Sequence, residues 1–203
     1  MENRNYQKEL DKITEEISRS GIRPSLLLHV CCAPCSSYCI EYLIRYFDIT
    51  LLFYNPNMDT ASEYARRSDE LQRLVKEAGF PVNVIIEPFV PEEFYSAVKG
   101  LETAPEGGER CFICYELRMR KAAAYAVSNH FDYFTTTLSV SPLKNAAIIN
   151  ETGERLSGEY GVKHLPSNFK KRGGYQRSIE LSHQYGLYRQ NYCGCIYSHL
   201  SDL

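Results

Sequence analysis

"SLLLHVCCAPCSSYCIEYLIRYF" (residues 25–47) contains the pattern from which the fold follows. Its first six residues form a short apolar run, which is typical of a buried strand. Residues 33–47 predict a helix, with Pro34 in the first turn, a position that proline favours. Cys31 and Cys32 stand between the two, directly after the strand. The stretch therefore predicts a strand, a turn that carries two thiols, and a helix.

The same alternation continues along the chain and indicates an α/β fold. Further β-rich segments are predicted over 49–55, 82–88, 133–141 and 162–166, and helices over 61–79, 91–100, from Cys111 onward, over 143–160 and over 175–186. Strands that alternate with helices predict a mostly parallel sheet with right-handed crossovers. Ligands of such sheets bind beyond the carboxyl ends of the strands, where Cys31, Cys32, Asn55 and residues 139–141 fall.

The two ends of the chain and its length define the expected organisation. Tyr6, Leu10, Ile13 and Ile17 recur at helical spacing, so we expect an N-terminal amphipathic helix extension over residues 1–23. Residues 24–203 then form a single α/β catalytic domain of ordinary size. The charged N-terminus is not a signal peptide, and every apolar run is far shorter than the ~20 residues of a membrane span. We expect a cytoplasmic protein without membrane association.

Eight cysteines fall into three groups, which is unusual for a chain in a reducing compartment. There, clustered cysteines more often bind metal or carry redox chemistry than form structural disulfides. Two adjacent thiols and one CxxC pair supply four thiolates, enough for a tetrahedral zinc or a [4Fe–4S] cluster: Cys31, Cys32, Cys111 and Cys114. Because thiolates bind both zinc and iron–sulfur clusters, the ligand type alone does not decide between the two. The position at the catalytic edge of the sheet favours iron–sulfur.

The remaining cysteines have different expected roles. Cys35 follows Cys32 by three residues, so it either reaches the metal or packs in the core, whereas Cys39 is expected to be a core residue. Cys193 and Cys195 are separated only by Gly194, and a disulfide between them would close a very small ring. Such a bond is strained and therefore labile, which predicts a redox-active pair. The alternative is that both are further metal ligands.

One basic segment interrupts an otherwise unremarkable charge distribution, since the net charge is only −2. "NFKKRGGYQR" (168–177) places basic residues beside Phe169 and Tyr175, and Arg189 lies between Tyr188 and Tyr192. The segment is either a solvated loop or a patch in which cations bind phosphates and aromatic rings stack on bases.

Five motifs together resemble one known family. "LLLHVCCAPCSS", "FYNPNMDTASEYARRSDE", "EGGERCFICYELRM", "FTTTLSVSPLKN" and "YRQNYCGCIYS" closely resemble the cobalamin-independent epoxyqueuosine reductases, from about Leu26 to Ser198. The resemblance implies a Rossmann-like fold related to adenine-nucleotide α-hydrolases. It also implies the last step of queuosine formation, in which the epoxide of a modified tRNA wobble base is reduced to an alkene and water is released.

The resemblance also implies roles for particular cysteines. Cys31, Cys32, Cys111 and Cys114 would hold a [4Fe–4S] cluster, and Cys193 and Cys195 would be the redox pair. Some relatives have Asp at the position of Cys35, so this residue is a candidate ligand of a second, mononuclear iron or zinc.

Epoxide reduction sets further requirements. It consumes two electrons and needs a proton donor or Lewis acid at the oxygen, for which Asp59 and Tyr64 are the candidate acids. An external electron donor must restore the redox pair. The anticodon loop of the tRNA offers exposed bases, and five basic residues are expected to bind its phosphates: Lys170, Lys171, Arg172, Arg177 and Arg189.

Two alternatives remain at this point. One is a non-catalytic zinc-binding RNA module with Cys193 and Cys195 as extra ligands. The other is a nucleotide-activating α-hydrolase such as a tRNA thiolase. Against the second, "HVCCAPCSS" lacks the glycine-rich phosphate loop that ATP binding requires.

Overall fold

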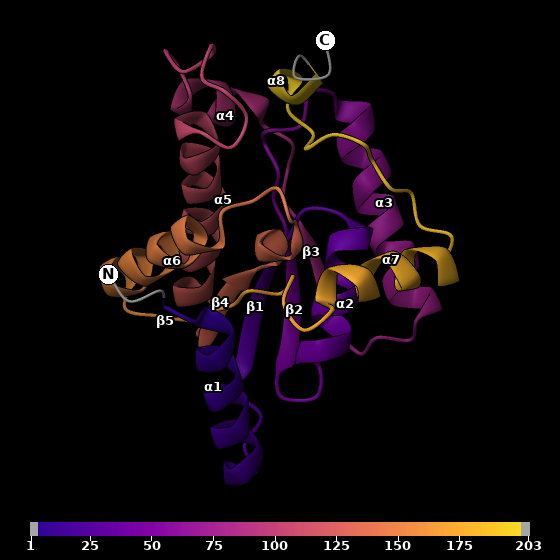
Figure 1. Ribbon diagram of the computed structural model, residues 1–203, viewed down its shortest axis with the longest axis vertical. Helices are drawn as coiled ribbons and strands as arrows, with labels where there is room; N and C mark the ends of the chain where they lie inside the picture. Colours follow the sequence, from indigo (N-terminus) through magenta and orange to yellow (C-terminus); the bar gives the residue numbers. More distant parts are fainter. Residues whose placement is uncertain (1–3, 200–203) are drawn as a thin grey trace.

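A five-stranded, entirely parallel sheet forms the centre of the computed structural model, which describes residues 4–199 (Figure 1). The strand order is β3-β2-β1-β4-β5, and every neighbouring pair is parallel. The strands are β1 (Ser25–Val30), β2 (Asp48–Phe53), β3 (Asn83–Ile86), β4 (Tyr133–Thr136) and β5 (Lys163–His164). The α/β, Rossmann-like architecture expected from the sequence is confirmed.

Helices cover both faces of this sheet. They are α1 (Tyr6–Ser20), α2 (Ala33–Leu43), α3 (Ala61–Glu77), α4 (Pro91–Ala97), α5 (Glu109–Ser128), α6 (Ala146–Tyr160), α7 (Gly174–Gln184) and α8 (Ile196–His199). Leu26, Leu28 and Val30 of β1 pack with residues of α1, α2 and α3 on one face. Leu27 packs with residues of α5 and α6 on the other. Because both faces are covered, the strand is apolar throughout rather than alternating.

The order of the strands places a binding site at the end of β1. The chain runs from β1 outward to β2 and β3, then returns to the other side of β1 to form β4 and β5. The crossovers therefore diverge between β1 and β4, and this is where parallel α/β sheets bind ligands. Cys31 and Cys32 follow β1 directly, at this switch point.

The N-terminal helix belongs to the same hydrophobic core as the sheet. Leu10 is fully buried in one cluster with Phe47 and Phe169, and Ile13 and Ile17 pack against that cluster. The amphipathic helix expected within residues 1–23 is present as α1, over Tyr6–Ser20. Among the described helices, none has the length and apolar character needed to cross a bilayer.

The clearest departure from the sequence-based elements follows β4. The β-rich segment predicted over 133–141 is a strand only as far as Thr136, and Thr137–Val140 is a 3₁₀ helix, η1. The Thr136 hydroxyl accepts a hydrogen bond from the Leu138 backbone N–H, so the side chain competes with the sheet and turns the chain. This turn carries residues 138–144 over the carboxyl end of the sheet.

Candidate metal and redox site

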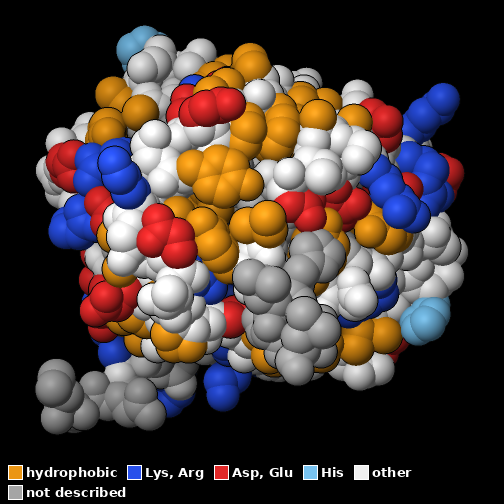
Figure 2. Space-filling model, turned by 90° about the horizontal axis from the view of Figure 1, so that it is seen from above, with side chains coloured by type: hydrophobic (Ala, Val, Ile, Leu, Met, Phe, Trp, Pro, Cys, Tyr) orange, Lys and Arg blue, Asp and Glu red, His pale blue; other side chains and the backbone are white. Residues whose placement is uncertain are grey.

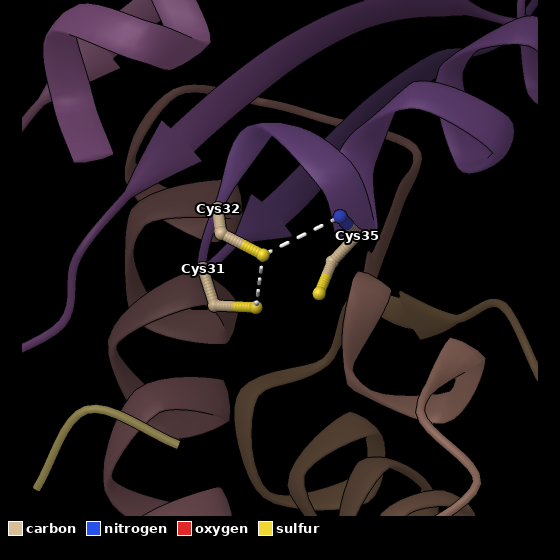
Figure 3. A group of neighbouring side chains, drawn as sticks. All are labelled: Cys31, Cys32 and Cys35. Carbon is tan, nitrogen blue, oxygen red and sulfur yellow. Dashed lines mark hydrogen bonds between the residues drawn. The ribbon is translucent and has the colours of Figure 1, made fainter. Parts of the chain in front are cut away.

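Three thiols converge at the start of α2 (Figure 3). The sulfurs of Cys31, Cys32 and Cys35 all lie within 4.8 Å of one another. Cys32 is the N-cap of α2, and its sulfur accepts a hydrogen bond from the Cys35 backbone N–H at 3.3 Å. The tight turn between β1 and α2, with Pro34 in the first helical turn, therefore points two adjacent side chains to the same side.

The three thiols share their negative charge unequally. Hydrogen bonds from Cys32 and Cys35 hold the pKa of Cys31 well below its usual value, and the nearby cations Lys144 and Arg118 lower it further. Burial raises the pKa of Cys32 to about 12, and hydrogen bonds to the other two sulfurs raise that of Cys35. The arrangement favours a thiolate on Cys31, which is the form that binds metal.

A second group of thiols lies at the start of α5 and in the C-terminal segment. The Gly107 backbone N–H lies 3.2 Å from the sulfur of Cys111 and donates to it. Burial raises the pKa of the neighbouring Cys114 to about 12. Cys114 and Cys195 belong to one apolar cluster with Phe94. The CxxC pair and the C-terminal pair are therefore neighbours in the fold.

A cavity of about 410 Å³ joins the two groups. Thiols from three distant parts of the chain line it: Cys31 and Cys35, then Cys111, then Cys193. A smaller space beside it is lined by Cys111, Cys114, Cys193 and Cys195. Cys39 is fully buried in the core with Leu43 and Phe47, as the sequence suggested. Seven of the eight cysteines thus belong to one site.

Residues of α3, and of the turn that precedes α3, hold the loop that carries Cys193 and Cys195. Arg67 donates to the Cys193 carbonyl at 3.2 Å, and the Asp59 backbone N–H donates to the Gly194 carbonyl at 2.9 Å. The Tyr192 hydroxyl lies 3.2 Å from the Asp59 carboxylate. Gly194 has φ +118°, and a Cβ there would stand 3.1 Å from the Arg67 guanidinium. Only glycine suits both the backbone conformation and the close approach.

Substitution of Gly194 tests this arrangement. We expect Gly194→Ala to lower the free energy of unfolding by about 3 kcal/mol, whereas Gly186→Ala should cost about 1 kcal/mol. Gly186 also has positive φ, but nothing lies within 4 Å of its added Cβ, so it is the matched control. Urea unfolding of the reduced protein measures both. Equal losses would mean that the contact with Arg67 is unimportant.

The two candidate acids, Asp59 and Tyr64, lie outside the lining of the cavity. Tyr64 is buried between Phe53 and Phe89, and its hydroxyl donates to the Glu87 carbonyl at 2.5 Å. Asp59 supports the Cys193–Cys195 loop. Neither residue lines the cavity. Their position supports a structural role and gives no support to proton donation.

Most of the basic residues expected to bind phosphates are engaged within the protein. Arg172 pairs with Asp11 at 2.5 Å, and Arg177 pairs with Glu41 at 2.7 Å. The Lys170 ammonium donates to the Lys144 carbonyl at 2.7 Å. Lys171 is exposed on the same turn. Of the five expected residues, only Arg189 lines the cavity.

The surface at the α8 end of the molecule is not a basic patch. Figure 2 shows hydrophobic and acidic side chains across much of its middle, with Lys and Arg gathered towards its edges. Any nucleic acid that reaches the cavity from this side would meet apolar contacts as well as charge.

The cavity residues that sequence inspection missed include two cations and one tyrosine. Tyr115, Arg118 and Lys144 all line the cavity. Arg118 follows Cys114 by four residues on α5 and therefore lies on the same helical face, a spacing that is visible in the sequence. Lys144 lies in the "SPLKN" segment after η1, and only the fold brings that segment to the thiols.

Comparison with known proteins identifies the family. The family model for epoxyqueuosine reductase QueH matches residues 26–201, which is most of the chain. The chain belongs to the QueH family. The matched region contains all seven cysteines of the site and begins after the end of α1.

Individual QueH relatives are similar over nearly the whole chain. Epoxyqueuosine reductase QueH of Streptococcus pyogenes serotype M1 is 43% identical over 198 residues, covering 96% of this chain and 78% of the relative. The protein of the same name from Staphylococcus epidermidis is 44% identical and covers 96% and 84%. That of Thermotoga maritima is 37% identical and covers 86% and 90%.

A solved structure shares the fold of this QueH protein at low sequence identity. The U34-tRNA thiolase NcsA from Methanococcus maripaludis with its [4Fe–4S] cluster superposes with a TM-score of 0.51. It is 14% identical and covers 96% of this chain and 73% of that chain. The similarity places the family among Rossmann-like α/β proteins.

Proposed function

We propose that the protein is an epoxyqueuosine reductase, which removes the epoxide oxygen from the modified wobble base of tRNA. The observation that carries this proposal is the meeting of seven thiols from three chain segments around one cavity, in a chain of the QueH family. In the reaction two C–O bonds break, a C=C bond forms, and two electrons and two protons convert the oxygen to water.

The donor set fits an iron–sulfur cluster together with a nearby single metal. Cys31, Cys32 and Cys35 are close enough to surround one ion, whereas Cys111 and Cys114 stand farther away, across the cavity. A cluster of four irons separates its ligands more than a single ion does. We therefore keep Cys31, Cys32, Cys111 and Cys114 as cluster ligands and Cys35 as a ligand of a second iron or zinc. A bound cluster would supply electrons one at a time.

Cys193 and Cys195 are the proposed two-electron store. Cys193 lines the cavity and Cys195 lines the smaller space next to Cys114. Oxidation of both thiols to one disulfide releases two electrons and two protons, which matches the demand of the epoxide. An external electron donor then reduces the disulfide.

The cavity itself supplies proton donors that the sequence did not suggest. The half-buried Lys144 and the buried Tyr115 both line it. We propose that these groups, rather than Asp59 or Tyr64, donate hydrogen bonds to the leaving oxygen. Apolar walls such as Val140 limit water around the reacting base.

The mouth of the cavity supports entry of a single-stranded RNA base. Leu143 is 79% exposed and Tyr175 is 36% exposed, and both line the cavity together with Pro142. Exposed apolar and aromatic side chains at the edge of a pocket stack on unpaired bases. We propose that these residues contact the bases next to the modified one, and that Arg189 and Lys171 bind phosphates.

Removal of the apolar mouth should weaken substrate binding selectively. We expect the double variant Leu143→Ser, Tyr175→Ala to raise KM for an anticodon stem-loop about tenfold, since each stacked base contributes ~1–3 kcal/mol, while kcat is retained. Steady-state kinetics measures both constants. Arg177→Gln is the control, because Arg177 is tied to Glu41 and Glu180. A KM that rises equally in the control would argue against the mouth.

An anaerobic assay tests the proposed function directly. Reconstituted protein, a chemical reductant and epoxyqueuosine-containing tRNA should yield queuosine, detected by mass spectrometry of the nucleosides. ATP should have no effect, because Cys32 and Pro34 occupy the turn where a phosphate loop would lie. Strict dependence on ATP would favour a nucleotide-activating enzyme, and a colourless protein with stoichiometric zinc and no turnover would favour the RNA module.

A further inference from the structure

Arg118 is a buried cation with almost nothing to neutralise it. The residue is 1% exposed and lies on α5, one turn after Cys114. Its Nε donates to the Cys114 carbonyl at 3.1 Å, and its Nη2 has no hydrogen-bond partner. The ring of Tyr115 is 6.0 Å away, at the limit of a cation–π contact. The side chain lines both the cavity and the smaller space beside it.

The other buried arginines of this region have more hydrogen-bond partners than Arg118, although one nitrogen of each, Arg67 Nη2 and Arg110 Nε, also has none. Arg67 pairs with Glu63 at 2.6 Å and also donates to the Cys193 carbonyl. Arg110 donates to the backbone carbonyls of Leu101, Glu102 and Ala104. Within residues 4–199 no carboxylate forms an ion pair with Arg118, although Glu106 lines the same cavity. A guanidinium does not lose its proton in proteins, so its charge must be balanced by another anion.

Thiols, which ionise when they bind metal, line the same two spaces as Arg118. Cys114 lies one turn away on the same helix, and Cys31 and Cys193 line the same cavity. Lys144 also lines the cavity but is only half-buried, whereas Arg118 is buried.

We propose that Arg118 is the fixed counter-cation of the thiolate-ligated redox centre, and that its charge makes that centre easier to reduce. The inference rests on the iron–sulfur part of the proposed function. Addition of one electron, from dithionite in the experiment below, makes the centre more negative by one charge. A buried positive charge next to it stabilises this reduced state more than the oxidised one.

Redox titration of the loaded protein tests the role of the charge. The midpoint potential of wild-type holoprotein is compared with that of Arg118→Gln, Arg118→Lys and Arg120→Gln by anaerobic titration with electron paramagnetic resonance. Arg120 is two residues farther along α5 but is half-exposed and paired with Glu116 and Glu159, so its variant is the matched control. We expect Arg118→Gln to disfavour reduction at least about tenfold, which is 59 mV for a one-electron couple.

The remaining variants decide the interpretation. Arg118→Lys keeps the charge and should stay within about threefold of the wild-type reduction equilibrium, and Arg120→Gln should not differ from wild type. An unchanged potential in Arg118→Gln, or an equal shift in Arg120→Gln, overturns the proposal. If Arg118→Gln binds no cluster, retention by Arg118→Lys supports the role of charge and loss from both shows that shape matters instead. Wild-type protein that binds no iron would instead refute the iron–sulfur function itself.

Discussion

Replacement of Cys193 or Cys195 by serine is expected to stop product formation after at most a single turnover. A serine hydroxyl cannot form a disulfide, so the two-electron store disappears while the cavity keeps its shape. Both side chains lie at the cavity or in the space beside it, next to the CxxC pair. Product formed per enzyme molecule, measured in anaerobic time courses with excess reductant, should level off instead of rising steadily.

The control for this experiment is the one cysteine outside the site. Cys39→Ala removes a thiol from the core, where Cys39 is fully buried, and should cost about 1 kcal/mol of stability without altering turnover. Sustained wild-type turnover in either serine variant would show that the pair is not a redox relay.

Substitution of a proposed cluster ligand should have an equally large effect through loss of metal. We expect Cys31→Ser and Cys111→Ser to bind far less iron and sulfide than wild type and to lose activity by about hundredfold or more. Cys31 has the lowered thiol pKa, and Cys111 lies at the opposite wall of the same cavity. Iron and acid-labile sulfide analysis with the visible spectrum measures the loss.

The outcome separates the competing metal assignments. Cys39→Ala should keep full iron content, because Cys39 is buried in the core and lines neither the cavity nor the smaller space beside it. Full iron content in Cys111→Ser would remove this residue from the ligand set and leave the group at α2 as the main metal site. Stoichiometric zinc in the wild-type protein would instead support the alternative of a non-catalytic zinc-binding RNA module.

Much of the fold could be predicted because it depends on local signals. The apolar run before Cys31, the Pro34 helix start and the alternation of elements are enough to specify a parallel sheet with its site after β1. The end of β4 could not be predicted, since one hydroxyl, that of Thr136, turns the chain out of the strand. The two-residue β5 is similarly too short to leave a clear pattern.

The residues of the candidate site also differ in how far local sequence signals reveal them. Cysteines are recognisable by type and spacing, so the sequence identified all seven that the fold brings together. The internal ion pairs of two of the predicted basic residues could not be foreseen because their partners are distant in sequence: Arg177 meets Glu41 and Arg172 meets Asp11 only after folding. Arg118 and Lys144 were overlooked for the converse reason, because a single cation in a sequence does not show that it will be buried beside thiols.

The three-segment construction of the cavity also affects how the protein reaches its native state. The cavity brings residue 31 next to residues 111 and 193, which are far away in the sequence. Such contacts form slowly during folding, because the long chain segments between them lose conformational entropy first. Until they form, reactive sulfurs are held by flexible chain rather than by rigid walls, and wrong crosslinks between them compete with correct assembly. Protection from oxidants is therefore required during biosynthesis, before the first substrate is ever encountered.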